Sequence, residues 1–156
     1  MKPKAPATHF MLAFLLALVG YIVVYHCIEH RRSRNGPWRV TFTNNAANAP
    51  VILINQEMLA MTNVRITFPG EALLVTNNPV TLTFREPAPV PYEVPFGKCV
   101  FMDTTFLPGT VTFQLFDHEI ELLPRVLTID RQEHPWRSGA EITLPRGQAP
   151  PAQAKP

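Results

Sequence analysis

The feature that most constrains this chain is an uncharged apolar stretch near its N-terminus, residues 10–28 (FMLAFLLALVGYIVVYHCI). The stretch contains no Asp, Glu, Lys or Arg. As an α-helix it would span roughly 28 Å, which is close to the hydrocarbon thickness of a bilayer. Few globular helices are apolar on every face over such a length. The stretch therefore predicts a single transmembrane helix, preceded by a short N-terminal stub at residues 1–9.

A cleaved signal peptide is the main alternative interpretation of this stretch. Cleavage requires small residues in an A-x-A pattern just after the apolar run. Tyr25, His26, Cys27 and Glu29 stand there instead, and they are bulky or polar. We therefore expect the helix to be retained as a signal-anchor of a single-pass membrane protein.

Basic residues flank the predicted helix on both sides. Lys2, Lys4 and the free amino terminus precede it, and Arg31, Arg32 and Arg34 follow it, with Arg39 a few residues farther on. The positive-inside rule compares these counts and favours a cytoplasmic C-terminal domain. A β domain behind one N-terminal helix is, however, a common plan of exported proteins, and by this analogy we favour the exterior side, periplasmic or extracellular. On either side we expect the three arginines to contact anionic headgroups.

The charge of the chain is divided unevenly between its two parts. Residues 1–34 hold five Lys or Arg and one Glu, whereas residues 35–156 hold nine Lys or Arg and eleven Asp or Glu. The second part therefore has a net charge of −2 (9 − 11), and it contains no run of Lys or Arg. Nucleic-acid binding has little electrostatic support in such a domain.

From Trp38 onward, apolar residues alternate with polar ones, which is the pattern of strands with one buried face. The residues expected to point inward are Val40, Phe42, Ile66, Phe68, Leu82, Phe84, Val111, Phe113 and Leu115. Residues 51–54, 72–75 and 99–102 are apolar on both faces, which predicts central strands that are covered on both sides. Turn-forming residues separate about nine or ten candidate strands. The sequence thus predicts an all-β fold, an antiparallel β-sandwich that is immunoglobulin-like or jelly-roll-like, over residues 38–144.

The remaining segments are predicted to be connections. Residues 29–37 (EHRRSRNGP) form a polar juxtamembrane linker in this interpretation. Residues 145–156, rich in Pro and Ala, contain no large apolar residue and are expected to be disordered. Residues 86–95 contain four prolines, which favours a stiff connection, with a ligand for a proline-recognition domain as the alternative.

The two cysteines are too few for a disulfide framework or for a zinc site built from cysteines. Cys27 lies at the end of the apolar stretch and Cys99 lies within the β region, so we expect no bridge between them. Cys99 is expected to be a small buried apolar residue.

The chain lacks the motifs of common catalytic and cofactor sites. It contains no G-x-S-x-G, no S-x-x-K and no glycine-rich phosphate loop. The densest polar cluster contains Asp117, His118, Asp130 and His134, whose imidazoles and carboxylates could ligate a divalent metal. Solvated turn residues are the simpler interpretation of this cluster. We therefore expect no catalytic residue, no cofactor and no bound metal, and these four residues are the candidate ligands if a metal binds.

These observations favour a non-catalytic interaction or scaffold module that is tethered to a membrane and belongs to a membrane-associated assembly. The expected partners are the lipid bilayer and other membrane proteins, and nucleic acid is not among them. A tethered domain that binds a metal or a small ligand is the first alternative, and a hydrolase is the second.

Overall fold

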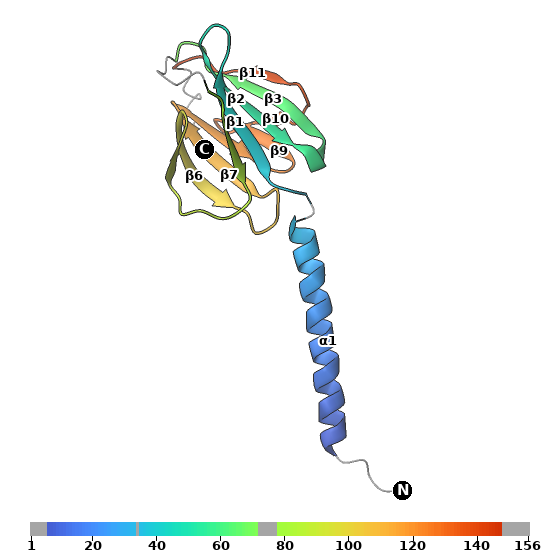
Figure 1. Cartoon of the computed structure of the whole chain (residues 1–156). Helices are drawn as coiled ribbons and strands as arrows, with labels where there is room; N and C mark the ends of the chain where they lie inside the picture. The colour runs from blue at the N-terminus through green and yellow to red at the C-terminus, as the bar shows by residue number, and fades with distance from the viewer. Residues whose placement is uncertain (1–5, 34, 72–77, 148–156) are drawn as a thin grey trace, which may run out of the picture. The chain divides into compact units, whose positions relative to one another are not determined.

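The computed structural model describes residues 6–33, 35–71 and 78–147, and these form two units (Figure 1). The N-terminal unit is the single helix α1 (Pro6–Ser33). The second unit contains all the strands and has its own hydrophobic core, and it is called the β domain below.

Helix α1 is longer at both ends than the apolar stretch that predicted it. Residues Ala7–Arg31 are long and apolar enough to cross a membrane, and none of this segment is buried inside the protein. The prediction that residues 29–37 form a linker was wrong for residues 29–33, which continue the helix. No glycine or proline interrupts the helix there, and the first such residues are Gly36 and Pro37.

The arginines after the apolar stretch are only partly described. Arg31 is exposed on α1. Arg34 lies outside the described residues, and so does the side chain of Arg32.

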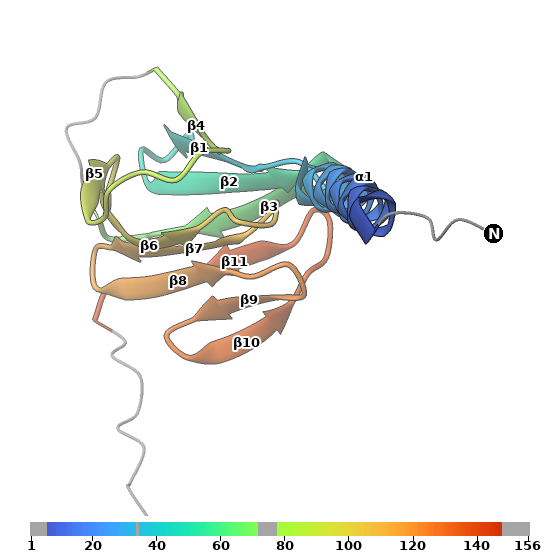
Figure 2. The same cartoon turned by 90° about the horizontal axis from the view of Figure 1, so that it is seen from below.

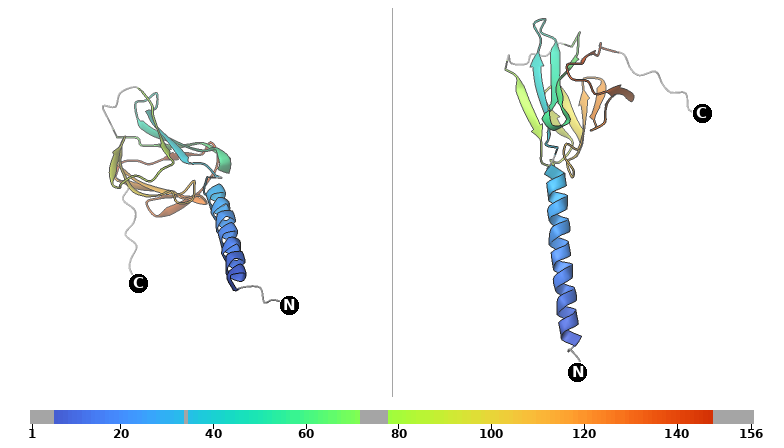
Figure 3. Two further views of the ribbon diagram at one scale, coloured as in Figure 1. Left: turned by 60° about the horizontal axis from the view of Figure 1, so that its bottom comes forward. Right: turned by 90° about the vertical axis from the view of Figure 1, so that its right-hand side faces the viewer.

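The β domain contains a five-stranded and a six-stranded sheet. The first has the order β11 (Glu141–Thr143), β3 (Met61–Thr67), β2 (Pro50–Gln56), β1 (Trp38–Asn44), β4 (Val80–Phe84). The second has the order β10 (Gln132–Pro135), β9 (Val126–Ile129), β8 (His118–Leu122), β7 (Thr110–Leu115), β6 (Gly97–Asp103), β5 (Tyr92–Val94). All neighbouring strands are antiparallel except β11, which runs parallel to β3. The sheets form two layers (Figures 2 and 3), which confirms the predicted β-sandwich.

The core is built from the faces that the alternation predicted. The buried residues from that prediction are Val40, Phe42, Ile66, Phe68, Phe84, Val111, Phe113 and Leu115. Leu82 is only partly buried against the core, because β4 is an edge strand. Phe113 of β7 meets Phe42 and Phe84 edge-to-face, with ring centroids 6.3 and 5.3 Å apart. Such aromatic contacts join the second sheet to the first.

The predicted central strands had different outcomes. Strand β2 lies between β1 and β3 and is buried along most of its length, as expected for residues 51–54. The prediction that residues 99–102 are covered on both sides was wrong, because Phe101 is half exposed. A register shift between Cys99 and Phe101 interrupts the pairing of β6 with β7, and an irregularity of this kind changes the direction of the side chains. Residues 72–75 lie within 72–77, outside the described residues, as do 148–156 of the predicted tail.

Gln56 fixes the segment that leads into β1. Its side chain is buried, and Nε2 lies 2.6 Å from the carbonyl oxygen of Asn35 and 3.0 Å from that of Gly36. Its Oε1 accepts a hydrogen bond from the Met58 N–H, at 2.9 Å. Met58 belongs to the short 3₁₀ helix η1 (Glu57–Leu59), which connects β2 to β3. A buried amide with both ends satisfied in this way orders the lead-in segment.

Two tryptophans join the sheets beside this segment. Trp38 is fully buried, and its indole Nε1–H donates to the carbonyl oxygen of Gly109, at 2.9 Å. Gly109 has a φ of +72°, and a Cβ there would collide with the Asp103 carbonyl. The ring of Trp136 lies 5.2 Å from that of Trp38 and donates to the Leu123 carbonyl, at 2.8 Å.

The independence of the β domain predicts that a fragment of residues 35–147 folds without α1. Within it, Phe113→Ala is expected to lower the free energy of unfolding by about 3–5 kcal/mol, because the ring contacts both sheets. Phe106→Ala, at a position that is 59% exposed, is the matched control and should change it by less than about 0.5 kcal/mol. Urea unfolding followed by far-ultraviolet circular dichroism measures both values. Equal losses in the two variants would contradict the assigned core.

Candidate functional site

Three tight turns of the second sheet meet at one end of the sandwich. They are residues 95–96 between β5 and β6, 116–117 between β7 and β8, and 130–131 between β9 and β10, and they are called the turn cluster. In the last turn Asp130 and Arg131 both have positive φ, 49° and 66°, as a type I′ hairpin turn requires. The Phe116 N–H donates to the Phe96 carbonyl oxygen, at 3.2 Å, which holds the first two turns together.

Aromatic rings support the turn cluster from beneath. Phe96 and Phe116 stack with ring centroids 5.9 Å apart, and the ring of Phe68, which directly follows β3 of the first sheet, lies 5.1 Å from that of Phe116. Phe42 meets Phe96 edge-to-face at 5.5 Å. The turns of the second sheet are therefore anchored on the core of the first.

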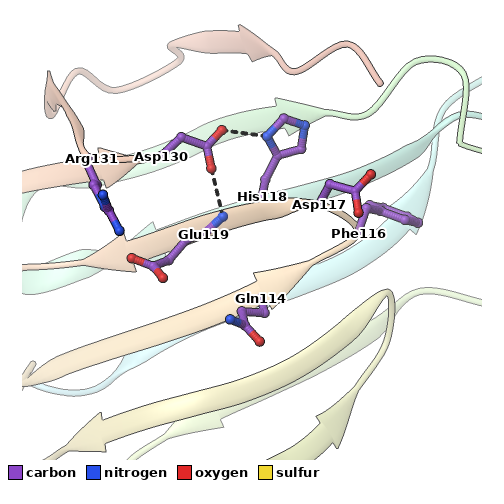
Figure 4. Close-up of a pocket in the computed structure, with 7 residues that line it drawn as sticks. All are labelled: Gln114, Phe116, Asp117, His118, Glu119, Asp130 and Arg131. Atoms are coloured by element: carbon purple, nitrogen blue, oxygen red, sulfur yellow. Dashed lines mark hydrogen bonds and ion pairs between the residues drawn. The ribbon is translucent and has the colours of Figure 1, made fainter. Parts of the chain in front are cut away.

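His118 and Asp130 form the central contact of the site. The imidazole Nδ1 lies 2.6 Å from Asp130 Oδ2, and the other carboxylate oxygen accepts from the Glu119 N–H at 2.9 Å (Figure 4). The Asp130 N–H in turn donates to the Glu119 carbonyl oxygen, at 2.9 Å. His118 is only 5% exposed, and its ring lies 6.1 Å from that of Phe68. One carboxylate thus links the β9–β10 turn, strand β8 and the buried imidazole.

An open pocket of about 440 Å³ lies at the same place (Figure 4). Its lining residues are Gln114, Phe116, Asp117, His118, Glu119, Asp130 and Arg131. Three carboxyl side chains and one guanidinium line it, so the pocket would favour a cationic ligand over an anionic one.

The chemistry of the pocket is limited by its residues. A carboxylate can only accept hydrogen bonds, so Nδ1 of His118 carries the proton, and the other ring nitrogen is the one that could act as base or metal ligand. No serine, threonine, cysteine or lysine is among the described residues that line the pocket. Among the described lining residues, the pair therefore has an orienting carboxylate and an imidazole but no neighbouring hydroxyl, thiol or amine nucleophile.

The buried thiol of Cys99 does not supply that nucleophile. Cys99 on β6 pairs across the strands with Tyr92, and it is not among the described residues that line the pocket. Burial raises the pKa of the Cys99 thiol, although its hydrogen bonds with Tyr92 and with the Phe101 backbone partly oppose this rise. The pKa of the Tyr92 hydroxyl is raised as well, mainly by burial and then by its hydrogen bond with Cys99. A protonated buried thiol is a structural residue rather than a reactive one.

The structure brings together three of the four candidate metal ligands. His118 and Asp130 are in direct contact, and Asp117 lines the same pocket. His134 does not, because it pairs with Leu127 on the β9–β10 hairpin beyond the turn. Among the described residues of a single chain, no three His, Cys, Asp or Glu side chains gather in a way that could hold a metal ion.

Sequence reasoning missed several residues of the site. Phe68, Phe116, Gln114 and Arg131 were not among the residues expected to contribute to it. The alternating patterns on both sides of residues 116–117 do locate that turn in the sequence, and a two-residue hairpin pairs Gln114 with Glu119 on one face. Phe68 reaches the site from the side of the first sheet, and no local sequence pattern indicates that it contacts Phe116 and His118.

The His118–Asp130 contact predicts a specific loss in Asp130→Asn. Asparagine keeps an acceptor for the Glu119 N–H and tolerates positive φ, but it removes the charged partner of the imidazole. We expect the free energy of unfolding to fall by about 1–3 kcal/mol in urea titrations. Asp117→Asn, in the same pocket but outside this contact, is the control and should be nearly neutral. An unchanged stability in Asp130→Asn would show that the contact contributes little.

No protein-family model, no curated protein and no solved structure matches this chain.

Proposed function

We propose that this protein is a non-catalytic interaction module tethered to a membrane, and that its β domain binds another membrane protein through the open edge of strand β4. Helix α1 is the proposed anchor, since it is long and apolar enough to cross a bilayer. The middle of the helix has no charged residue, so it offers neither an ion path nor a substrate site.

The observation that carries this proposal is the contrast between β4 and the other sheet edges. Exposed edges usually avoid unwanted pairing through charged residues, prolines or very short strands. Strand β10 contains Glu133 and ends at Pro135, and β11 has three residues, of which Glu141 pairs with Arg65 at 3.4 Å. Strand β5 has three residues among the prolines of residues 86–95.

Strand β4 has five residues, more than any of these three strands, and is less protected than they are. Its sequence VTLTF contains no charged residue and no proline, and its outer edge has no strand neighbour among the described residues. Val80 is 38% exposed, and Thr81 and Thr83 are exposed as well. An extended segment of a partner could add to this edge through backbone hydrogen bonds, with the exposed side chains providing selectivity.

The membrane surface is the second proposed partner. Arg31, Arg32 and Arg34 would contact anionic headgroups, whereas the net charge of −2 on residues 35–156 opposes contact of the β domain with such a surface. The β domain would therefore remain available to a protein partner. We place it on the exterior side, by analogy with other β domains behind one anchor.

Binding of a small ligand is the second candidate function, supported by the pocket beside His118 and Asp130. Its three carboxyl groups would suit a small cation or an amine. A hydrolase is the third candidate, and it has less support because no hydroxyl, thiol or amine nucleophile is among the described lining residues.

The edge proposal is tested by crosslinking in membranes. A photoactivatable amino acid at Val80 of the full chain is expected to crosslink to another membrane protein, and Thr83→Lys should abolish the product because a lysine disfavours edge pairing. Thr143→Lys, on edge strand β11, is the matched control and should leave the product unchanged. Crosslinking that is insensitive to Thr83→Lys would contradict binding at β4.

The proposed orientation is tested by two fusions after Pro145, one to alkaline phosphatase and one to a fluorescent protein. Alkaline phosphatase needs an oxidising compartment to form its disulfides, so an exterior β domain should give active phosphatase. A fluorescent fusion together with an inactive phosphatase fusion would place the β domain in the cytoplasm.

A further inference from the structure

Two histidines stand one turn apart near the C-terminal end of α1. His26 and His30 are at positions i and i+4 of a continuous helix, and both are exposed. Residues with this spacing lie about 40° apart around the helix axis, with Cβ atoms about 6 Å apart. The two imidazoles therefore share one face of the helix and can bind the same ion.

The position of this pair makes it accessible to metal ions. The apolar stretch ends at Ile28, and Glu29 is the first charged residue after it. Residues Ala7–Arg31 would extend about 37 Å as a helix, which exceeds the hydrocarbon core of about 30 Å. The C-terminal end of such a helix, where charged residues begin at Glu29, therefore reaches the polar interfacial layer, in which water and dissolved ions are present.

The chemistry of the pair selects a class of metal. Two imidazoles at i and i+4 on a helix are a recurrent half of zinc sites. Imidazole nitrogen suits Zn²⁺ and neighbouring transition metals, whereas Mg²⁺ and Ca²⁺ prefer oxygen ligands. A tetrahedral zinc ion needs four ligands, and the described part of a single chain gathers no group of three. The pair supplies half of a site.

We propose that His26 and His30 bind Zn²⁺ together with the same two histidines of a second copy of this chain, so that the ion joins two α1 helices. A parallel pair of helices related by a two-fold axis brings the same face of each copy together. Four imidazoles then surround one ion, which completes its coordination. This inference concerns α1 alone and does not depend on the β4 edge.

Cys27 lies close to this face and provides an internal probe. It is three residues before His30, about 60° away around the axis, and it is a free, exposed thiol. A thiolate is also a zinc ligand. Its participation is distinguishable, because cobalt in place of zinc gives a sulfur-to-metal charge-transfer band only when a thiolate is bound.

The experiment uses the full chain in detergent micelles, with Co²⁺ as a spectroscopic probe and Zn²⁺ as competitor. We expect the visible absorption of tetrahedral Co²⁺, its displacement by Zn²⁺, one metal per two chains, and metal-dependent dimers that EDTA dissociates. His26→Ala and His30→Ala should each weaken binding at least about tenfold, because the second ligand of a chelate binds at high effective concentration.

Two matched variants test whether metal binding depends on the spacing of His26 and His30 or only on the number of histidines in the chain. The double variant His26→Ile, Ile28→His keeps the composition but destroys the i and i+4 spacing, so it should bind as weakly as His26→Ala. His9→Ala removes the histidine near the other end of α1 and should bind normally. Binding that survives His26→Ala, His30→Ala or the double variant would overturn the proposal, as would one metal per monomer. A charge-transfer band lost in Cys27→Ser would overturn the all-histidine ligand set.

Discussion

The β domain depends on the burial of Trp38 at the start of β1. This residue belongs to the first sheet, yet its indole bonds to the Gly109 carbonyl in the β6–β7 connection of the second, and it packs against Trp136 after β10. Two regions of the second sheet are thereby joined to one side chain of the first. Gln56 secures the three residues immediately before Trp38, so the segment that leads into the first strand is fixed within the β domain. An alanine at position 38 would remove the aromatic contact and also leave the Gly109 carbonyl without its indole partner.

The turn cluster joins the two sheets through a second, separate set of contacts. There, Phe68 of the first sheet reaches Phe116 and His118 of the second, and Asp130 connects that histidine to the last hairpin. The Asp130 carboxylate uses one oxygen for the imidazole and the other for a backbone N–H, as a residue that holds a turn in place does. Holding the turn in place is a sufficient explanation for the His118–Asp130 contact, and a catalytic role is not needed to explain it. A function for the domain is therefore better sought on its surface, where β4 differs from the other edges.

Local pattern was sufficient to predict the sandwich and most of its inward faces, because strand alternation is a property of neighbouring residues. It could not predict contacts that depend on how distant strands align. The approach of Asp130 to His118 follows from the β8–β9 register, and the Trp38–Gly109 bond links residues that are 71 positions apart. The error at residues 99–102 has a similar cause, since hydropathy gives no sign of the register shift that accompanies the exposed Phe101. The prediction that the helix ends before the polar residues 29–33 was also wrong. Charged residues such as Arg31 have good helix propensity, and no glycine or proline intervenes there.

A short edge strand and a membrane anchor complement each other energetically. Strand β4 has five residues, preceded by Pro79 and followed by Arg85, so a partner strand could form only a few backbone hydrogen bonds with it. Each such bond contributes only about 0.5–1.5 kcal/mol net, and association in solution costs several kcal/mol in translational and rotational freedom. Two proteins held in the same membrane have already lost much of that freedom, and their effective concentration is correspondingly high. An edge too short to capture a soluble partner can then suffice for one in the bilayer, and the same shortness limits pairing with unrelated strands elsewhere.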